Sequence, residues 1–202
     1  MHIFLTFDLE NFFVFIVMKK IAILSSSVRD GERMSHRVAL FLKKYFEKKQ
    51  QAEIIFLDLK EYNFPLFTER LAFQKEPTQS VLDFTEKFKS VDALIIVTPV
   101  YNASFPAALK NVIDLYFNEW KRKIVAVSTV TGGMVPALVT VKDVQALMLK
   151  LNAIVSPTAF TVINTVNEYD ADGNAVNLEK TEKLLKPFIA DLNWLIEKIL
   201  GK

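Results

Sequence analysis

One stretch combines side chains that could contact a ligand with a position where ligands commonly bind. It is TPVYNASFP, residues 98–106, and its polar members are Tyr101, Asn102 and Ser104. It follows an apolar, β-branched run at 91–97, typical of a buried strand, and precedes a helical pattern at 106–117. Ligands of open α/β sheets bind just beyond the carboxyl ends of strands, so this stretch is a candidate wall of a binding crevice. An ordinary strand-to-helix connection is the alternative.

A second, hydroxyl-rich loop precedes the first predicted helix. Its serines and arginine are Ser25, Ser26, Ser27, Arg29 and Ser35. A helix N-terminus presents free N–H donors and a partial positive charge, so these residues could form an anion site. The loop has no Walker A signature, and Gly31 alone does not make a dinucleotide fingerprint. A serine-rich loop without a ligand is the alternative, and Asp30 and Glu32 would oppose a phosphate unless they point outward.

Other residues have both a functional and a structural interpretation. His36 could donate to a phosphate, although a partly exposed helix residue is the commoner role. The run STVTGG at 128–133 could let a flat ligand approach the backbone at Gly132, or could form a simple turn. Trp120 and Trp194 favour core or interface packing over ring stacking.

Strands and helices alternate along the chain, which would bring these loops to one edge of a sheet. Apolar runs predict strands at 19–24, 53–57, 91–97, 123–128 and 153–163. Parallel pairing needs helical crossovers, so helices should cover both faces. This rhythm predicts an α/β, flavodoxin-like three-layer sandwich with a five-stranded parallel sheet of order 2-1-3-4-5. The crevice between strands 1 and 3 would then lie between the 25–35 and 98–106 loops.

Helical periodicity completes the prediction. Besides 106–117, helices are expected near 36–49, 78–90, 135–151 and 178–200. The 78–90 helix should begin at a Thr78 cap and turn these residues inward: Val81, Leu82, Phe84 and Phe88. The last helix should be kinked or loosened at Pro187. The 58–77 segment is predicted to be irregular.

Composition excludes several function classes. The chain of 202 residues contains no cysteine, which excludes disulfides and thiolate chemistry and fits a reducing, cytoplasmic compartment. Two histidines cannot form a histidine metal cluster, and a net charge of +2 gives no reason to expect nucleic acid. No Gly-x-Ser-x-Gly elbow or paired carboxylates indicate hydrolysis. No apolar run approaches the roughly 20 residues that span a bilayer.

The first 17 residues form a separate question. They are rich in Phe, Leu and Ile, but Asp8 and Glu10 interrupt them and the lysines follow rather than precede them, unlike a signal peptide. We expect residues 1–17 to be an extension upstream of a natural start at Met18, and residues 18–202 to form the flavodoxin-like domain. An extension packed on this domain or on a partner, or a weak membrane anchor, are the alternatives.

From Lys19 onward the chain resembles the NADPH-dependent FMN reductase family of flavodoxin-like proteins. The family's first loop typically reads Gly-Ser-x-Arg with a serine at the helix start, matched by Ser27, Arg29 and Ser35, with Ser26 in place of the glycine. Its second signature is close to Pro-Glu-Tyr-Asn-Gly-Ser-x-Pro-Gly-x-Leu-Lys-Asn-x-x-Asp. The matching residues are Pro99, Tyr101, Asn102, Ser104, Pro106, Leu109, Lys110, Asn111 and Asp114, whereas Val100, Ala103 and Ala107 depart. The 128–133 run corresponds to a third, Ser/Thr- and Gly-rich turn.

The resemblance implies a set of FMN-binding residues. The phosphate would be bound by Ser27, Arg29, Ser35 and His36. The isoalloxazine would be flanked by Pro99, Tyr101, Asn102, Ala103 and Ser104 on one side, and by Ser128, Thr129 and Gly132 on the other. Alanine at position 103 puts in doubt any loop conformation that needs a positive φ there.

The resemblance also implies a function. It is an NADPH- or NADH-dependent FMN oxidoreductase that passes electrons to a quinone, flavin, azo compound or similar small acceptor, without a protein general acid or base. The resemblance further implies a homodimer or a dimer of dimers. The contact surface could include Tyr116, Phe117 and Trp120, although packing of these residues in the core is an equal alternative. An electron carrier like flavodoxin is the first alternative, although a pI near 8.6 speaks against it. A flavodoxin-fold module without enzymatic activity is the second.

Overall fold

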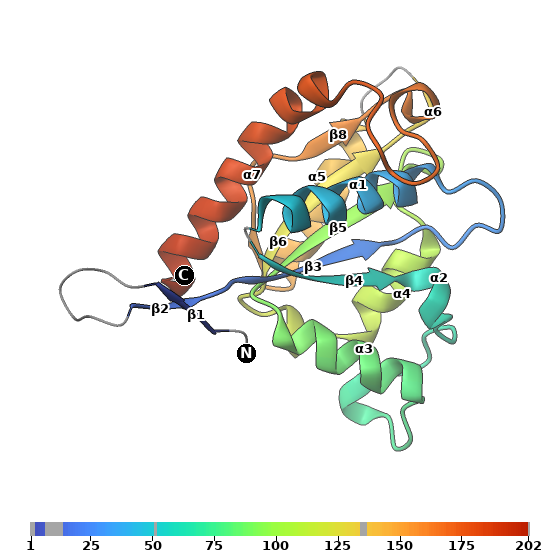
Figure 1. Cartoon of the computed structure of the whole chain (residues 1–202). Helices are drawn as coiled ribbons and strands as arrows, with labels where there is room; N and C mark the ends of the chain where they lie inside the picture. The colour runs from blue at the N-terminus through green and yellow to red at the C-terminus, as the bar shows by residue number, and fades with distance from the viewer. Residues whose placement is uncertain (1–2, 7–13, 51, 134–136, 202) are drawn as a thin grey trace.

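The predicted parallel sheet is present. In the computed structural model, which describes residues 3–6, 14–50, 52–133 and 137–201, the sheet has the order β4-β3-β5-β6-β7 (Figure 1). These strands are Glu53–Asp58, Lys20–Ser25, Ala93–Pro99, Ile124–Val130 and Ile154–Val155, and every pairing is parallel. The flavodoxin-like order 2-1-3-4-5 is confirmed.

The last strand is divided in two, where a single strand was predicted. β7 and β8 (Phe160–Val162) both pair with β6, at different places along its length. The Ser156 N–H still donates to the Val125 carbonyl at 2.8 Å, but Pro157 has no N–H to continue the ladder. The chain therefore leaves the sheet at this proline and returns three residues later as β8.

Helices cover both faces of the sheet (Figure 1). α1 (Met34–Lys49) and α7 (Leu178–Leu200) pack on one face, and α3 (Gln79–Ser90), α4 (Ala107–Leu115) and α5 (Leu138–Lys150) on the other. Side chains alternate along each strand, so Ile21 and Ile23 face α1 while Ala22 and Leu24 face the opposite layer. Burial on both faces explains why the central strands are almost wholly apolar.

Short elements connect these layers. α2 (Leu59–Tyr62) and the 3₁₀ turn η1 (Leu71–Phe73) lie within the segment predicted to be irregular, and η2 (Asn118–Trp120) follows α4. α6 (Thr165–Glu168) lies between β8 and α7. β1 (Ile3–Thr6) and β2 (Val14–Val17) form a separate antiparallel hairpin. Within the described residues, no helix has both the length and the apolar character needed to cross a membrane.

The helix predictions are right in position and partly wrong in detail. The Thr78 hydroxyl caps α3 as predicted, but Leu82 is 46% exposed rather than turned inward. The α7 helix continues through Pro187 as one element of 23 residues. Trp120 is buried and its indole N–H donates to the Ile113 carbonyl, whereas Trp194 is 57% exposed and is not a core residue.

Candidate cofactor site

The three candidate loops meet at the carboxyl edge of the sheet. Strand register places Ser25, Val97 and Ser128 side by side. The Ser26 N–H donates to the Val97 carbonyl at 3.1 Å, and the Val100 N–H donates to the Val130 carbonyl at 3.2 Å. A 3.3 Å hydrogen bond between the Ser27 and Tyr101 hydroxyls joins the first loop directly to the second. The predicted convergence of these loops is confirmed.

The first loop carries a buried hydroxyl without a partner. Ser35 lies in the first turn of α1, is only 1% exposed, and its Oγ has no hydrogen-bond partner among the described residues. A buried hydroxyl left unpaired costs free energy, so such an atom calls for an explanation. Its place among the free N–H groups of a helix N-terminus is where an anion would satisfy it.

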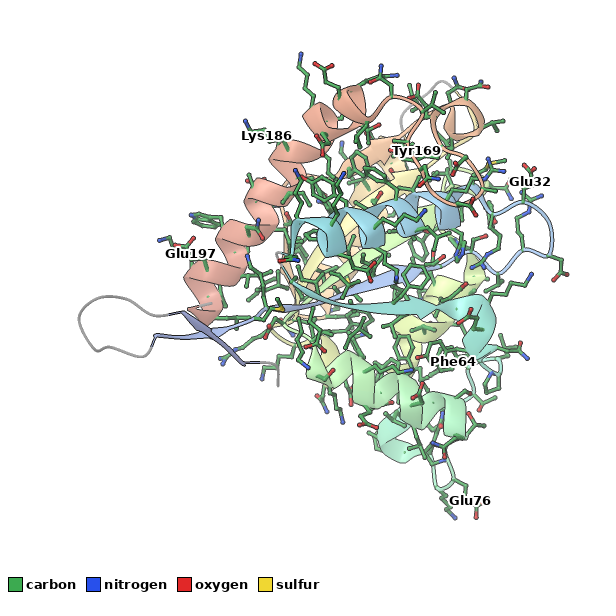
Figure 2. The ribbon with its side chains drawn as sticks, viewed as in Figure 1. Glu32, Phe64, Glu76, Tyr169, Lys186 and Glu197 are labelled. Atoms are coloured by element: carbon green, nitrogen blue, oxygen red, sulfur yellow. The ribbon has the colours of Figure 1, made fainter. Side chains whose placement is uncertain are left out.

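The acidic residues of this loop are exposed and paired with basic side chains. Glu32 lies at the outer tip of the loop (Figure 2) and pairs with Arg37 at 3.4 Å. The Asp30 carboxylate is fully exposed and lies 3.4 Å from the Lys60 ammonium. Each carboxylate is therefore compensated by a neighbouring cation, Glu32 by Arg37 and Asp30 by Lys60, which weakens the objection to a phosphate in this loop.

An arginine that the sequence did not single out organises the base of the loop. The Arg33 Nε donates to the Ser27 carbonyl at 2.9 Å, and its Nη1 donates to Asp58 at 2.8 Å. Nη2 contacts the other oxygen of Asp58 and donates to Ser25 Oγ at 3.4 Å. One feature of the sequence could have indicated this ion pair. Asp58 ends the largely apolar strand β4, and the loop next to that strand contains arginines.

His36 is tied into the same cluster. Its Nδ1 lies 3.0 Å from Ser25 Oγ and 3.4 Å from Asp58 Oδ2, and its ring packs edge-on against Phe56. Only Nε2 is therefore left to meet a ligand. Burial, followed by the nearby Arg33 guanidinium, lowers the pKa of His36 below its ordinary value, and Asp58 opposes this only in part. The imidazole is accordingly neutral at neutral pH.

This lowered pKa predicts a pH-dependent stability. The unfolded chain binds a proton at His36 more readily than the folded chain does, so folding loses stability as the pH falls below about 6.5. The free energy of unfolding, measured with urea at about pH 7.5 and pH 5.5, should fall less in His36→Gln than in the parent. Equal losses in the two proteins would show that His36 does not contribute.

The second loop contains a tight two-residue turn. Tyr101 and Ser104 exchange backbone hydrogen bonds of 2.8 and 3.0 Å, and the residues between them, Asn102 and Ala103, have φ values of 51° and 63°. Positive φ at both central residues is the type I′ geometry, which Asn-Gly fits best. Thr140 Oγ1 holds the turn by donating to the Ala103 carbonyl at 3.1 Å. The positive φ questioned at position 103 is thus present, and an alanine adopts it.

Replacing this alanine by glycine should stabilise the protein. A left-handed backbone costs a residue with a Cβ roughly 1–2 kcal/mol, which glycine avoids in part because it also loses more entropy on folding. We expect Ala103→Gly to raise the free energy of unfolding by about 0.5–1 kcal/mol in urea titrations. Ala107→Gly, in the first turn of α4, should lower it by a similar amount. A destabilised Ala103→Gly variant would contradict the turn geometry.

The N–H groups of this turn are available to a ligand. Within the described part of the chain, those of Asn102 and Ala103 donate to no backbone carbonyl, and both residues are exposed. Pro99, by contrast, is buried as the last residue of β5. The turn therefore presents donors at the carboxyl edge while β5 anchors it.

The predicted residues of the third loop differ in what they can offer. Ser128 Oγ donates to the Phe160 carbonyl at 2.8 Å, so this hydroxyl is engaged within the sheet. The buried Thr129 Oγ1 has no partner among the described residues and is a second unexplained hydroxyl at this edge. Gly132 is exposed, and a Cβ there would meet nothing within 4 Å.

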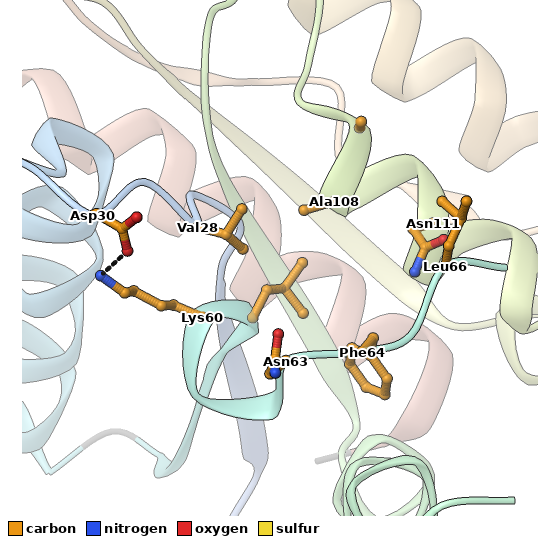
Figure 3. Close-up of a pocket in the computed structure, with 10 residues that line it drawn as sticks. Val28, Asp30, Lys60, Asn63, Phe64, Leu66, Ala108 and Asn111 are labelled. Atoms are coloured by element: carbon orange, nitrogen blue, oxygen red, sulfur yellow. Dashed lines mark ion pairs between the residues drawn. The ribbon is translucent and has the colours of Figure 1, made fainter.

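A cavity of about 440 Å³ borders the site (Figure 3). Val28 and Asp30 of the first loop line it on one side, and residues of α2, the 63–66 segment and α4 form the rest of its lining. Leu59, Phe64 and Leu66 make it largely apolar, and the Lys60–Asp30 ion pair lies at its margin. Residues 99–104 do not line this cavity, which lies between Val28 and Asp30 of the first loop and the start of α4. Elsewhere in the described chain, no group of three or more His, Asp or Glu side chains could hold a metal ion.

Comparison with known proteins identifies relatives of this chain. A family model described as NADPH-dependent FMN reductase matches residues 19–168. The chain is 29% identical over 117 residues to an NAD(P)H-dependent FMN reductase of Saccharomyces cerevisiae, an alignment that covers 52% of this chain and 61% of that protein. It is 29% identical over 151 residues to an FMN-dependent NADH:quinone oxidoreductase of Mesoplasma florum, covering 71% and 74% of the two chains.

A solved structure agrees with these sequence relatives. The flavoenzyme NAD(P)H:(acceptor) oxidoreductase FerB of Paracoccus denitrificans superposes with a TM-score of 0.73 at 26% identity. The superposition covers 89% of this chain and 98% of that one.

Proposed function

Because the chain belongs to the NADPH-dependent FMN reductase family, we propose that it is an FMN-dependent NAD(P)H oxidoreductase acting on a small acceptor. A quinone, a free flavin or an azo compound is the acceptor class that we propose. The names of the yeast, Mesoplasma and Paracoccus relatives support this proposal. A cytoplasmic location is part of it, in keeping with a sequence that contains no cysteine.

The residues of the site fit FMN, and one observation carries the assignment. The unpartnered Ser35 hydroxyl is buried at the N-terminus of a 16-residue helix, inside a loop rich in hydroxyls. A phosphate supplies acceptor oxygens for such donors, and the helix N-terminus favours its negative charge. The unpartnered Thr129 hydroxyl, two strands away at the same edge, supports a ligand that extends across the crevice.

The candidate residues divide into two groups. Ser27, Arg29 and Ser35 are proposed to bind the phosphate, with His36 contributing through Nε2. The proposed neighbours of the isoalloxazine are Pro99, Tyr101, Asn102, Ala103, Ser104, Thr129 and Gly132. Ser128 is proposed to contribute through its backbone, since its hydroxyl donates to Phe160.

The protein's own part in the reaction is binding and electrostatics. FMN, when bound, supplies the hydride-accepting chemistry. The N–H groups of Asn102 and Ala103 provide donors that would stabilise negative charge on a ring placed against the turn. We assign no general acid or base to a side chain of this site, because hydride transfer to a bound flavin is the chemistry of the cofactor itself.

Removing the Ser35 hydroxyl should have opposite effects on stability and binding. Ser35→Ala removes an unsatisfied buried group, so the free energy of unfolding without flavin should rise by about 1 kcal/mol. The same change should weaken FMN binding by about 1–2 kcal/mol in a fluorescence titration. Ser26→Ala is the matched control, because the Ser26 hydroxyl donates to Val97 and its loss should destabilise the protein instead. A Ser35→Ala variant that binds FMN as tightly as the parent would remove Ser35 from the phosphate site.

Steady-state kinetics test the enzyme assignment against its alternatives. With FMN bound, the protein should oxidise NADPH or NADH continuously when menadione is present. An electron carrier would bind FMN but turn over negligibly by itself, and a module without enzymatic activity would do neither. The pI near 8.6 favours the enzyme over a carrier, since carriers of this kind are commonly acidic. Negligible turnover of the FMN-loaded protein with both nucleotides would contradict the proposal.

We also propose that the protein assembles as a homodimer through the surface next to α4. Tyr116 and Trp120, considered above as contact residues, are buried in the core, but Phe117 is 43% exposed. The Arg70 guanidinium carbon lies 4.5 Å from the centre of the Phe117 ring. This contact joins Phe117 to a segment in which Leu66 and Phe73 are exposed. Exposed apolar side chains gathered in one region favour an interface. Sedimentation equilibrium should give a dimer that Phe73→Ser weakens, and a monomer at all concentrations would contradict it.

A further inference from the structure

A carboxylate is buried beside the loop proposed to bind the FMN phosphate. Asp58 is the last residue of β4, and its side chain is only 2% exposed. One of its oxygens caps α2 by accepting the Lys60 backbone N–H at 3.0 Å. A buried carboxylate has the same sign of charge as a phosphate and is weakly screened by solvent, so it would oppose phosphate binding unless compensated.

Arg33 compensates this charge and holds the loop at the same time. Two of its nitrogens contact the two oxygens of Asp58, and its Nε donates to the Ser27 carbonyl at 2.9 Å. The pair therefore joins the end of β4 to the loop between β3 and α1. The same hydrogen bond from Arg33 occupies the Ser27 carbonyl oxygen, whose partial negative charge would otherwise oppose a phosphate.

Arg33 and Arg29 differ in what their side chains are free to do. All three nitrogens of the Arg33 guanidinium already donate to the protein, and the side chain is 13% exposed. Arg29 is exposed, and among the residues that the structure describes only its backbone carbonyl takes part in a hydrogen bond, which it accepts from the Lys60 ammonium. Arg29 is thus available to contact a ligand directly, whereas Arg33 is fixed as a support behind the loop.

We propose that Arg33 is a positioning residue that gives the site its selectivity for the phosphorylated flavin, by neutralising Asp58 and holding the Ser27 carbonyl. This inference rests on the proposed function, because it concerns the same loop. FMN carries a phosphate of charge near −2, whereas riboflavin carries none. Loss of the Arg33 charge should therefore penalise FMN and leave riboflavin almost unaffected.

The test compares the two flavins on the full-length protein after its flavin has been removed. Fluorescence titrations with FMN and with riboflavin should show that Arg33→Met raises the Kd for FMN by about tenfold or more and that for riboflavin by less than about threefold. Combining it with Asp58→Asn, which removes the buried charge, should restore most of the FMN affinity. Asp58→Asn alone should bind FMN as tightly as the parent or more tightly, which keeps the test available if Arg33→Met folds poorly.

Arg37 offers a matched control. Its side chain is 14% exposed, almost the same as that of Arg33, but it donates to the Tyr169 carbonyl and pairs with Glu32 instead of Asp58. Arg37→Met removes the same charge one turn further along, inside α1, and should change the two dissociation constants by similar, small factors. A change of selectivity in Arg37→Met as large as in Arg33→Met would overturn the inference, because net charge alone would then explain it.

The failure of this inference is distinguishable from failure of the proposed function. Equal weakening of FMN and riboflavin by Arg33→Met, or no recovery in the double variant, would mean that Arg33 only stabilises the loop. Either result overturns the inference and leaves the flavin site intact. A parent protein that binds neither flavin would instead overturn the proposed function.

Discussion

Gly173→Ala is expected to lower the free energy of unfolding by about 3 kcal/mol. Gly173 has a φ of +79°, and a Cβ at this position would lie 2.6 Å from the Leu40 Cβ, 2.7 Å from the Arg37 carbonyl oxygen and 2.8 Å from the Phe41 nitrogen. Two of these atoms belong to the backbone of α1 and cannot rotate away. The left-handed conformation contributes about 1–2 kcal/mol of this cost, and the forced displacement of α1 contributes the rest.

Urea denaturation of Gly173→Ala and Gly31→Ala measures this effect. A Cβ added to Gly31 meets nothing within 4 Å, so the free energy of unfolding of Gly31→Ala should differ from that of the parent by at most about 1 kcal/mol. The two variants contain the same substitution in different surroundings, because Gly173 packs against α1 whereas Gly31 is exposed to solvent. A Gly173→Ala protein as stable as the parent would mean that the turn at 170–174 does not pack on α1 as described.

Arg29→Ala is expected to weaken FMN binding by about 1.5–3 kcal/mol, the contribution of a hydrogen bond to a charged group. The Lys60 ammonium donates to the Arg29 carbonyl at 3.1 Å, so the backbone of this residue is tethered while its guanidinium is exposed at the proposed phosphate site. Removing the side chain therefore takes away a donor without dismantling the loop, and the unfolding free energy should hardly change.

Titration of the flavin-free protein with FMN measures this loss. Arg122→Ala is the matched control, because Arg122 is also exposed but lies just before β6, at the opposite end of the strand from the site. It should change the Kd for FMN by less than about twofold. An Arg29→Ala variant with the parent's Kd would remove Arg29 from the phosphate site, although the proposal for Ser35 would remain.

The sheet could be predicted from the sequence because its pattern is local and repetitive. Residues 93–97 are buried on both faces, so nearly every position is apolar and the strand is visible without its neighbours. The same reasoning did not extend to Leu82. It fits the apolar pattern of α3, but its exposure depends on which part of the helix meets the sheet.

The candidate site was predictable only where a residue's role depends on its own loop. Ser35 and the polar residues of 101–104 are candidates by residue type and spacing, and the structure adds that Ser35 is unpartnered and that 101–104 form a turn in which Ala103 adopts a positive φ. The Arg33–Asp58 pair was not predictable in this way. Its members lie 25 residues apart, and their contact depends on the pairing of β3 with β4. The division of the last strand, by contrast, has a sign in the sequence, because Pro157 stands between Ser156 and Thr158 and separates two apolar runs.

The central claim is that the crevice between the 25–35 and 98–106 loops binds FMN. The visible absorption spectrum of the purified protein tests it most directly, with FMN added to the solution if the protein is isolated without flavin. If the crevice binds FMN, flavin absorption bands should stay with the protein on gel filtration, and heating should release the cofactor as FMN. A protein that remains colourless after incubation with excess FMN would contradict the account.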